Sequence, residues 1–396
     1  MSVFFTRNAQ TENMKKYLSV SAAAVAACCM VVGGSSALKA QAEEKLACKA
    51  AYLCDFESGT KVYSENEEKR LPIASMCKIM TLLLSFEAVE SGELSFDEQI
   101  TVSENAAGMG GSQVFLDAGL SYKVDDLMRT VAVCSANDSC VALAERVAGS
   151  ESDFIERMNA RAKELGAENT LFANCTGLPK EPQYSCAKDV SVMLRELLKH
   201  QKYYEFSKVW LEDFVHPDGR TTSITNTNKL IRSYVGCDGG KTGFTNEAGF
   251  CLAATAKRGD TRIISVVIGA DSSKSRNKTI TELFDYAFNS YETKPFLEVG
   301  QSVGKVNVRG SKIKEVDLVA EGTLSAFCKK GEDGGINAEY HFPEKVTAPL
   351  VAGAILGEAV LYRDGVEIAR TNLIAKEEAA RYSWWDSLRE GARNWN

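Results

Sequence analysis

The hydrophobic periodicity of the chain changes along its length, and these changes limit the folds that it can adopt. Between Ser75 and Lys199, apolar residues recur at helical spacing in several pieces. From Gly240 the spacing becomes that of strands joined by short turns, and a helix follows over 274–291. An alternating apolar hairpin over 50–64 precedes the helices. Strands on both sides of a helical middle predict a layered α/β domain, with the first and last helices on one sheet face.

Beyond Pro295 the pattern consists of short strands alone. Asp364-Gly365, between alternating apolar residues, is a strong hairpin signal, because this dipeptide adopts the backbone that a two-residue turn needs. At 396 residues the chain is long enough for two domains. The sequence therefore predicts an α/β domain over 43–292 and a smaller all-β domain over 293–375.

The beginning of the chain has the composition of an export signal. Lys15-Lys16 is basic, residues 18–34 are apolar and uncharged, and Ala40-Gln41-Ala42 has the small-x-small pattern of a cleavage site. These regions in this order predict a secretory signal peptide over 1–42. A permanent anchor and a lipid on Cys28 are the alternatives, but the apolar run is at the short end for a membrane span. We therefore expect an exported protein that acts outside the cytoplasmic membrane.

Charge and cysteine content narrow the class further. The formal net charge of −7 argues against a nucleic-acid partner, since such proteins present strongly basic surfaces. Of the 12 cysteines, Cys28 and Cys29 lie in the predicted signal, and the others form no C-x-x-C pair. Several, such as Cys77 and Cys251, stand where a small apolar residue would fit. We expect free thiols that fill the core rather than disulfides.

The C-terminal segment, residues 376–396, is predicted to be an amphipathic helix. One face at helical spacing carries Tyr382, Trp385, Leu388, Ala392 and Trp395. Trp and Tyr favour the boundary between a membrane and water, so the segment is predicted to anchor the protein to a membrane surface. A helix packed on its own domain is the alternative interpretation.

Three short motifs occur in order along the chain: Ser75-Met76-Cys77-Lys78, Ser135-Ala136-Asn137 and Lys241-Thr242-Gly243. The first opens an apolar helix, the second lies between two helical segments, and the third starts a strand. Each motif alone arises by chance in many proteins. Their order, and their placement on a helix, a loop and a strand, together indicate a serine enzyme that uses a lysine as its base.

The first motif has the spacing that nucleophilic catalysis needs. Ser75 and Lys78 lie one turn apart on one helix face, so the amine can reach the hydroxyl. A lysine beside an apolar helix tends to lose its proton, as a general base at neutral pH requires. At the helix start, the backbone N–H of Ser75 is free to stabilise an oxyanion, and the N–H of Phe244 is a second candidate donor.

The other motif residues are candidates for proton transfer and substrate binding. Ser135 can relay a proton between Lys78 and the leaving amine, and Asn137 offers an amide that orients either the substrate or Lys78. Lys241 offers a positive charge to a substrate C-terminal carboxylate. Thr242 and Thr245 offer two hydroxyls to the same carboxylate. Gly243 lets a peptide approach the strand closely.

Other catalytic classes fit the sequence poorly. Residues 108–112 are rich in glycine but lack the Gly-Lys-Ser/Thr ending of a phosphate loop. The three histidines, His200, His216 and His341, are all far from Ser75 in the sequence, which disfavours a Ser-His-Asp triad. Histidine ligands at the helical spacing of a zinc peptidase are absent from the sequence. We therefore expect neither a metal nor a cofactor.

The motifs and their surroundings resemble the low-molecular-mass penicillin-binding proteins, the serine-type D-Ala-D-Ala carboxypeptidases. The resemblance covers roughly residues 48–292, and the later strands are similar to the C-terminal β domain of that family. It implies a penicillin-binding protein or β-lactamase-like fold, an antiparallel sheet with helices, followed by a small all-β domain. The segments that carry it beyond the motifs are Gly111-Ser112, Asn174 to Pro179, Tyr184 to Asp189, Asn226 to Leu230, Gly239 to Phe250 and Ala270 to Arg276.

The resemblance also implies roles for the motif residues. By it, Ser75 is the acylated nucleophile, Lys78 the proton acceptor, Ser135 the proton relay and Lys241 the substrate-binding residue. Two positions depart from the commonest pattern: Ala136 replaces a glycine of the second motif, and Phe244 replaces a frequent histidine after the third. Both positions contribute backbone groups, so we expect activity with a shifted substrate preference.

The implied reaction removes the terminal D-alanine from a peptidoglycan stem pentapeptide through an acyl-enzyme on Ser75. Penicillins and other β-lactams would acylate the same serine. A β-lactamase, a transpeptidase and a non-catalytic peptidoglycan-binding protein are the rival hypotheses. The Glu-x-x-Leu-Asn sequence of class A β-lactamases is absent between Asn137 and Lys241, which favours the peptidase. Members of the family often end in an amphipathic membrane helix, which supports the predicted anchor.

Overall fold

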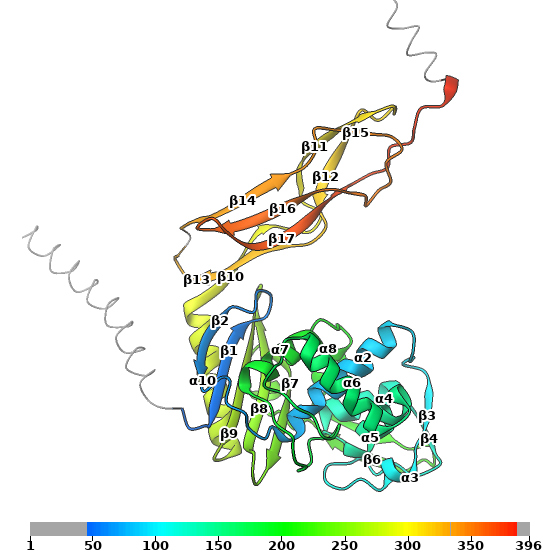
Figure 1. Ribbon diagram of the computed structural model, residues 1–396, viewed down its shortest axis with the longest axis vertical. Coiled ribbons are helices and arrows are strands. Elements are labelled where there is room, and N and C mark those ends of the chain that lie inside the picture. Colours follow the sequence, from blue (N-terminus) through cyan, green and yellow to red (C-terminus); the bar gives the residue numbers. More distant parts are fainter. Residues whose placement is uncertain (1–45, 333, 386–396) are drawn as a thin grey trace, which may run out of the picture. The chain divides into compact units, whose positions relative to one another are not determined.

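The computed structural model describes residues 46–332 and 334–385 (Figure 1). The whole of the predicted signal peptide lies outside these residues. The first domain is built on a five-stranded antiparallel sheet with the order β2-β1-β9-β8-β7. Its strands are β1 (Ala50–Asp55), β2 (Lys61–Glu65), β7 (Cys237–Thr245), β8 (Gly249–Arg258) and β9 (Thr261–Ala270).

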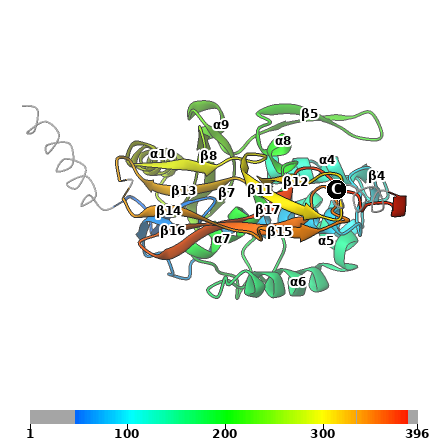
Figure 2. The same cartoon turned by 90° about the horizontal axis from the view of Figure 1, so that it is seen from above.

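Different helices cover the two faces of this sheet. Ile264 and Val266 of β9 belong to the hydrophobic layer that also contains residues of helix α7 (Ala187–Leu197). Helix α10 (Ser273–Ser290) packs on β8 and β9, but its buried residues lie outside that layer, because α10 is on the opposite face (Figure 2). The expectation that the first and last helices share one face is therefore wrong. Helix α7, rather than the first helix, packs on the face opposite α10.

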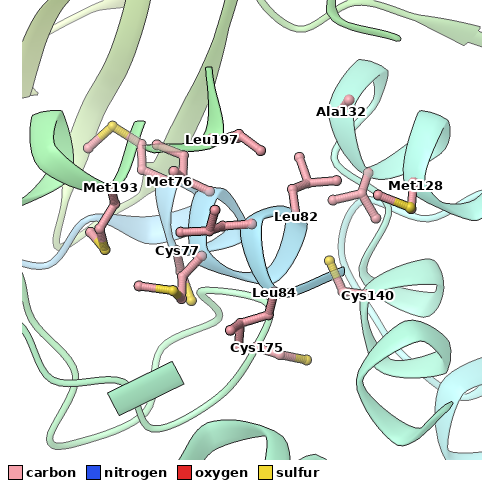
Figure 3. Packing of buried hydrophobic residues seen from close by; sticks show 14 of the residues in the cluster. Met76, Cys77, Leu82, Leu84, Met128, Ala132, Cys140, Cys175, Met193 and Leu197 are labelled. Atoms are coloured by element: carbon pink, nitrogen blue, oxygen red, sulfur yellow. The ribbon is translucent and has the colours of Figure 1, made fainter. Parts of the chain in front are cut away.

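The first helix, α2 (Lys78–Glu90), runs through the middle of a helical layer. Every residue from Lys78 to Phe86 is buried, as expected for a helix that is surrounded by other elements. Figure 3 shows Leu82 and Leu84 of this helix among side chains from neighbouring segments, including Met128 and Cys140. This packing fixes the helix that follows the first motif. The neighbouring helices are α4 (Val124–Val133), α5 (Asn137–Ala148), α6 (Glu151–Glu164) and α7.

Shorter elements complete the first domain. Two small two-stranded sheets and three short helices lie between the larger elements. They are β3 (Gln99–Thr101) with β4 (Ser121–Lys123), β5 (Leu211–Val215) with β6 (Thr221–Thr225), α3 (Glu104–Ala107), α8 (Tyr203–Ser207) and α9 (Leu230–Ser233).

The ten cysteines in the described part of the chain are all free, and eight of them are buried. Cys77, Cys140 and Cys175 fill the core around helix α2 (Figure 3). Burial raises the pKa of the Cys140 thiol to about 11, so this thiol stays protonated and unreactive at neutral pH. The prediction of cysteines as small core residues is confirmed for these positions.

A loop folds back onto the N-terminus of helix α5, beside the second motif. The buried carboxylate of Asp138 accepts hydrogen bonds from the backbone N–H groups of Val114 at 3.0 Å and Leu116 at 3.1 Å. The N–H of Asn137 donates to the carbonyl oxygen of Ser112 at 2.7 Å. A carboxylate in the first turn is also favoured by the helix dipole. These contacts hold the loop in place.

The second domain is all β, as predicted. Strands β10 (Tyr291–Leu297) and β13 (Leu324–Lys329) form one pair, and a six-stranded sheet has the order β14-β16-β17-β12-β11-β15. The predicted hairpin at Asp364-Gly365 joins β16 to β17. Strands β10, β13, β14 and β15 were not predicted, because they are short or because polar residues and a proline interrupt their alternation. The six strands are β11 (Ser302–Arg309), β12 (Glu315–Ala320), β14 (Ile336–His341), β15 (Lys345–Thr347), β16 (Ile355–Arg363) and β17 (Val366–Ala375).

The beginning of the C-terminal segment differs from its prediction. Residues 376–383 are not helical. Instead, Ala379 exchanges backbone hydrogen bonds with Leu350 and is fully buried, and Arg381 forms a bridge with Ser311. These contacts with the β domain replace the expected first turns of helix. The rest of the predicted amphipathic face, from Leu388 onward, lies outside the described residues. None of the described helices is long and apolar enough to cross a membrane.

We predict that Asp138→Ala destabilises the first domain by roughly 2–4 kcal/mol, because two buried N–H groups lose their acceptor. Urea unfolding followed by circular dichroism measures this change. Asp213→Ala, at an exposed position on strand β5, is the control and should change stability by less than about 0.5 kcal/mol. Equal effects of the two substitutions would contradict the anchoring role of Asp138.

Candidate active site

The nucleophile candidate of the first motif lies on a turn just before helix α2. Ser75 is part of the 3-10 turn η1 (Ala74–Cys77), and the α-helix itself begins at Lys78. Ala74 has a φ of +48°, and the N–H of Met76 donates to Ile73 O at 3.2 Å. The prediction that the helix starts at Ser75 is therefore wrong by one turn. Ser75 and Lys78 nevertheless face each other.

The amine of Lys78 is buried and held by three parts of the chain. Its Nζ donates to the carbonyl oxygen of Thr176 at 2.5 Å, to Asn137 Oδ1 at 2.6 Å and to Ser75 Oγ at 3.1 Å. A neutral amine has two N–H bonds and one lone pair, whereas the carbonyl and amide oxygens can only accept. In the neutral form these two oxygens take both N–H bonds and leave the lone pair for Ser75 Oγ. The geometry therefore suits Lys78 to accept the serine proton.

The side-chain amide of Asn137 is fixed on both sides. Its Nδ2 donates to the carbonyl oxygen of Gly110 at 2.6 Å, which directs Oδ1 toward Lys78. Asn137 was predicted to orient either the substrate or Lys78, and in the structure its amide contacts Lys78. Thr176 was not predicted as a site residue, because it acts through its backbone carbonyl and its side chain carries no signal of that role.

Ser135 occupies a strained position between helices α4 and α5. Its φ of +67° lies in a region that residues other than glycine rarely adopt. Its Oγ is buried and has no hydrogen-bond partner among the described residues. Such a hydroxyl costs about 1–3 kcal/mol, which a substrate atom that pairs with it would recover. Lys78 donates to other atoms, so the predicted relay between Ser135 and Lys78 stays a prediction.

Two glycines bring the backbone of the site together. A Cβ at Gly243, on the free edge strand β7, would lie 2.6 Å from Ile73 O and 3.1 Å from Ser75 N. On the other side, a Cβ at Gly177 would overlap Ala74 O, and Gly177 has a φ of +80°. Only glycine fits at either position. The strand and the loop therefore both pass directly against the turn that carries Ser75.

Lys241 is a buried cation, and no carboxylate among the described residues pairs with it. Its Nζ donates to the carbonyl oxygen of Thr242 at 3.1 Å. Burial lowers the pKa of Lys241 from 10.5 to about 7, and the charge of nearby Lys78 contributes to this change. A bound anion would favour the charged form of Lys241. This environment suits the predicted contact with a substrate carboxylate.

The hydroxyls predicted to bind the carboxylate also make contacts within the protein. Thr242 Oγ1 donates to Thr227 Oγ1 at 2.8 Å, and Thr245 Oγ1 accepts from the N–H of Ala248 at 3.0 Å. The hydrogen of Thr245 remains available for a substrate. Phe244 follows on the strand with an exposed ring that packs at a tilt against Phe250, at 4.4 Å between ring centroids.

Arg276 is a functional candidate that the motif analysis missed. Its side chain is buried at the start of helix α10, and its guanidinium contacts Ser273 Oγ, Asn277 Oδ1 and the carbonyl oxygen of Cys251. No carboxylate among the described residues neutralises it, and burial lowers its pKa to about 10. The carbonyl oxygen of Cys251 that it contacts belongs to the residue that pairs with Gly243 on strand β7, two positions from Lys241, and its charge contributes to the lowered pKa of Lys241. A buried arginine without an acidic partner is the signal that reveals it.

A Ser–Lys pair beside the edge strand of an antiparallel sheet defines the penicillin-binding and β-lactamase-like class of serine acyl-transfer enzymes. The chain belongs to the D-alanyl-D-alanine carboxypeptidase family, whose family model matches residues 37–272. Residues 291–381 match the C-terminal domain of penicillin-binding protein 5. The predicted fold class, family and enzyme activity are confirmed.

Individual relatives agree with this family. The chain is 40% identical over 349 residues to D-alanyl-D-alanine carboxypeptidase DacF of Bacillus subtilis, which covers 88% of this chain and 90% of that protein. Penicillin-binding protein 5 from Haemophilus influenzae has a similar structure, with a TM-score of 0.66, 30% identity, and coverage of 85% and 98%. Penicillin-binding protein D2 from Listeria monocytogenes, in its ampicillin-bound form, has a TM-score of 0.56 and 32% identity, over 62% of this chain and 99% of that one.

The pKa of Lys241 predicts a pH dependence of carboxylate binding. Below about pH 7 the free enzyme carries the ammonium, and above it the ammonium is lost. A bound carboxylate raises the pKa of Lys241, so binding above pH 7 requires the uptake of a proton. We expect the affinity of the Ser75→Ala variant for a peptide ending in D-Ala-D-Ala to fall up to about tenfold per pH unit above pH 7. Calorimetric titration between pH 6 and 9 measures this fall, and an unchanged affinity would contradict it.

Proposed function

We propose that the chain removes the terminal D-alanine from peptidoglycan stem peptides through an acyl-enzyme on Ser75. The observation that carries this proposal is the contact of Lys78 with both Ser75 and Asn137 in a buried site. The family membership supplies the reaction class. The roles of the individual residues are our assignment from the geometry of the site.

In the acylation step, Ser75 Oγ attacks the carbonyl carbon of the penultimate D-alanine, and its proton passes to Lys78 Nζ. The N–H groups of Ser75 and Phe244 stabilise the oxyanion that forms. When the C–N bond breaks, Lys78 gives up the proton that it received, and this proton passes through Ser135 to the amine of the terminal D-alanine; the Ser135 hydroxyl is free to bond that amine. The bond to Ser75 is now an ester, and D-alanine leaves as the first product.

In the deacylation step, water attacks the ester carbon and gives its proton to Lys78. The ester bond breaks, and Ser75 recovers a proton as the shortened peptide leaves. Among the described residues, no carboxylate forms a hydrogen bond with Lys78, Ser135 or Lys241. A class A β-lactamase mechanism with a glutamate base therefore has no support here, and lysine is the base in both steps.

Substrate recognition rests on the C-terminal carboxylate of the peptide. Lys241 and Arg276 provide two positive charges that no carboxylate among the described residues neutralises. Charge-assisted hydrogen bonds to a carboxylate are about twice as strong as neutral ones, so these residues favour peptides with a free C-terminus. We propose that β-lactams, which also carry a carboxylate, bind at the same position and acylate Ser75.

We further propose that the enzyme is exported and acts at the outer surface of the cytoplasmic membrane. The composition of residues 1–42 supports export. The tail supports attachment, since Trp384 and Trp385 at its start are 68% and 67% exposed and belong to a segment rich in aromatic residues.

We predict that Ser75→Ala lowers the rate of D-alanine release from a peptide ending in D-Ala-D-Ala by at least about a thousandfold, because the covalent route is lost. Enzymatic detection of free D-alanine measures this rate. Ser233→Ala, at an exposed position on helix α9, is the matched control and should retain full activity.

Labelling with penicillin provides the second readout. The protein should gain the mass of one penicillin on Ser75, and the Ser75→Ala variant should gain none. Release of D-alanine by the variant at the wild-type rate would overturn the assigned nucleophile. Rapid hydrolysis of penicillin without D-alanine release would favour a β-lactamase instead, and capture of the acyl group by an added amine would favour a transpeptidase.

A further inference from the structure

The loop over 108–120 connects helix α3 to strand β4 and holds the amide that contacts the base. The carbonyl oxygens of Gly110 and Ser112, both in this loop, accept hydrogen bonds from the side chain and the backbone of Asn137. Asn137 in turn accepts a hydrogen bond from Lys78. The position of Lys78 therefore depends on the loop. A residue that fixes the loop from elsewhere acts on the reaction without touching the substrate.

Arg220, directly before strand β6, contacts the middle of this loop. Its Nη2 donates to the carbonyl oxygen of Phe115 at 2.9 Å and forms an ion pair with the carboxylate of Asp117. Phe115 has a φ of +63°, which residues other than glycine rarely adopt. The N–H groups of the residues on either side of Phe115 donate to Asp138. A strained conformation persists only where its surroundings hold it, and here Arg220 and Asp138 hold one segment from two different elements.

His216, directly after strand β5, is buried, and both of its ring nitrogens have partners. Nδ1 lies 3.1 Å from the hydroxyl of Tyr122 and 3.3 Å from Arg220 Nη2. Nε2 lies 2.9 Å from Thr222 Oγ1, which donates to the carbonyl oxygen of Val114 in the loop. A guanidinium can only donate, so Nδ1 accepts and Nε2 carries the hydrogen. The neutral imidazole therefore fits its partners.

The protonated form of His216 does not fit these contacts. Its Nδ1–H would face the N–H of Arg220, and the hydroxyl hydrogen of Tyr122 would lose its acceptor. Burial first, and then the charge of Arg220, lower the pKa of His216 below its ordinary value of 6.5. Three nearby carboxylates act in the opposite direction: Asp117, Asp218 and Asp138. The neutral ring thus predominates at neutral pH, and it gains a proton only as the pH falls below 6.5.

We propose that Arg220 and His216 are positioning residues, which hold the loop against helix α5 from the β5–β6 hairpin and thereby keep Asn137 and Lys78 in place for the reaction. The inference rests on the proposed function, since it takes Lys78 as the base. The contacts of Arg220 and His216 with other described residues do not include Ser75, Lys78 or Lys241. Releasing the loop should therefore slow the chemical steps and leave peptide affinity unchanged.

The first test measures D-alanine release from a peptide ending in D-Ala-D-Ala. Arg220→Met keeps a long side chain and removes every donor. We expect its kcat/KM to fall by roughly five- to fiftyfold, because a small displacement of a reacting group has a large effect on rate. Calorimetry in the Ser75→Ala background should show the same peptide affinity, within about twofold, with and without Arg220→Met. Arg220→Lys keeps the charge and the donors, and it should recover most of the rate.

A matched control and a second measurement separate position from stability. Arg157→Met removes an arginine on helix α6 that forms an exposed ion pair with Glu93, and this variant should keep full activity. Hydrogen exchange of the backbone N–H groups over 108–120, followed by mass spectrometry, reports the opening of the loop directly. Exchange should be faster in Arg220→Met and unchanged in Arg157→Met and Arg220→Lys.

His216→Gln gives an independent readout through pH. Glutamine keeps one acceptor and a donor, as the neutral imidazole does, but it does not titrate. We expect the ratio of wild-type kcat/KM to that of His216→Gln to be constant above pH 6.5. Below that pH the ratio should fall by up to about tenfold per unit, because only the wild type gains a proton there. Titrations that both proteins share, including that of the base, cancel in this ratio.

These measurements give outcomes that overturn the inference. Wild-type activity of Arg220→Met would do so, as would a loss of peptide affinity equal to the loss of rate. A ratio that stays constant down to about pH 5 would overturn the role of His216, and this ratio decides the matter if Arg220→Met does not fold. Failure of the wild type to release D-alanine would instead overturn the proposed function. The exchange measurement would then still report whether Arg220 holds the loop.

Discussion

The active site depends on the hydrogen bonds that hold the buried amine of Lys78. In them, Lys78 Nζ donates to the carbonyl oxygen of Thr176, the amide oxygen of Asn137 and the hydroxyl of Ser75. A buried amine needs such partners, because leaving it unpaired costs several kcal/mol. The contacts also join three segments that are far apart in the sequence. Any movement of the loop that contains Thr176, or of helix α5, therefore changes the position of Lys78 relative to Ser75.

Steric constraints reinforce this arrangement. Gly243 and Gly177 let a strand and a loop approach the backbone around Ser75 from two sides. The turn itself has little freedom, since Ala74 holds a positive φ value within a closely packed core, and Ser135 does so between helices α4 and α5. Strain of this kind persists only where the surroundings determine the conformation. The buried helix α2 and the thiols around it provide these rigid surroundings.

The sequence predicted those parts of the fold and site that side-chain patterns report. Helix α4 lies in the region of predicted helical spacing between Ser75 and Lys199, and the Asp364-Gly365 hairpin is present. The contact of Asn137 with Lys78 is one of the two roles that the motifs predicted for this amide. Thr176 could not be predicted, because its carbonyl would act in the same way with another side chain. The start of the tail was predicted as helix from its helical periodicity. That periodicity does not report a backbone pairing with a distant segment, and here the buried Ala379 pairs with Leu350.

Charge balance distinguishes the two halves of the proposed reaction. In the free site, no carboxylate among the described residues neutralises the charges of Lys241 and Arg276. On the proposed mechanism, the carboxylate of the peptide provides this counter-charge. On the proposed mechanism, this carboxylate leaves with D-alanine after acylation, so the pKa of Lys241 returns toward 7 before water attacks. A penicillin acyl group keeps its carboxylate after its ring opens. The counter-charge then remains beside Lys241 and favours its protonated form. On the proposed mechanism, the penicillin acyl-enzyme therefore keeps a charge balance at Lys241 that the peptide acyl-enzyme loses.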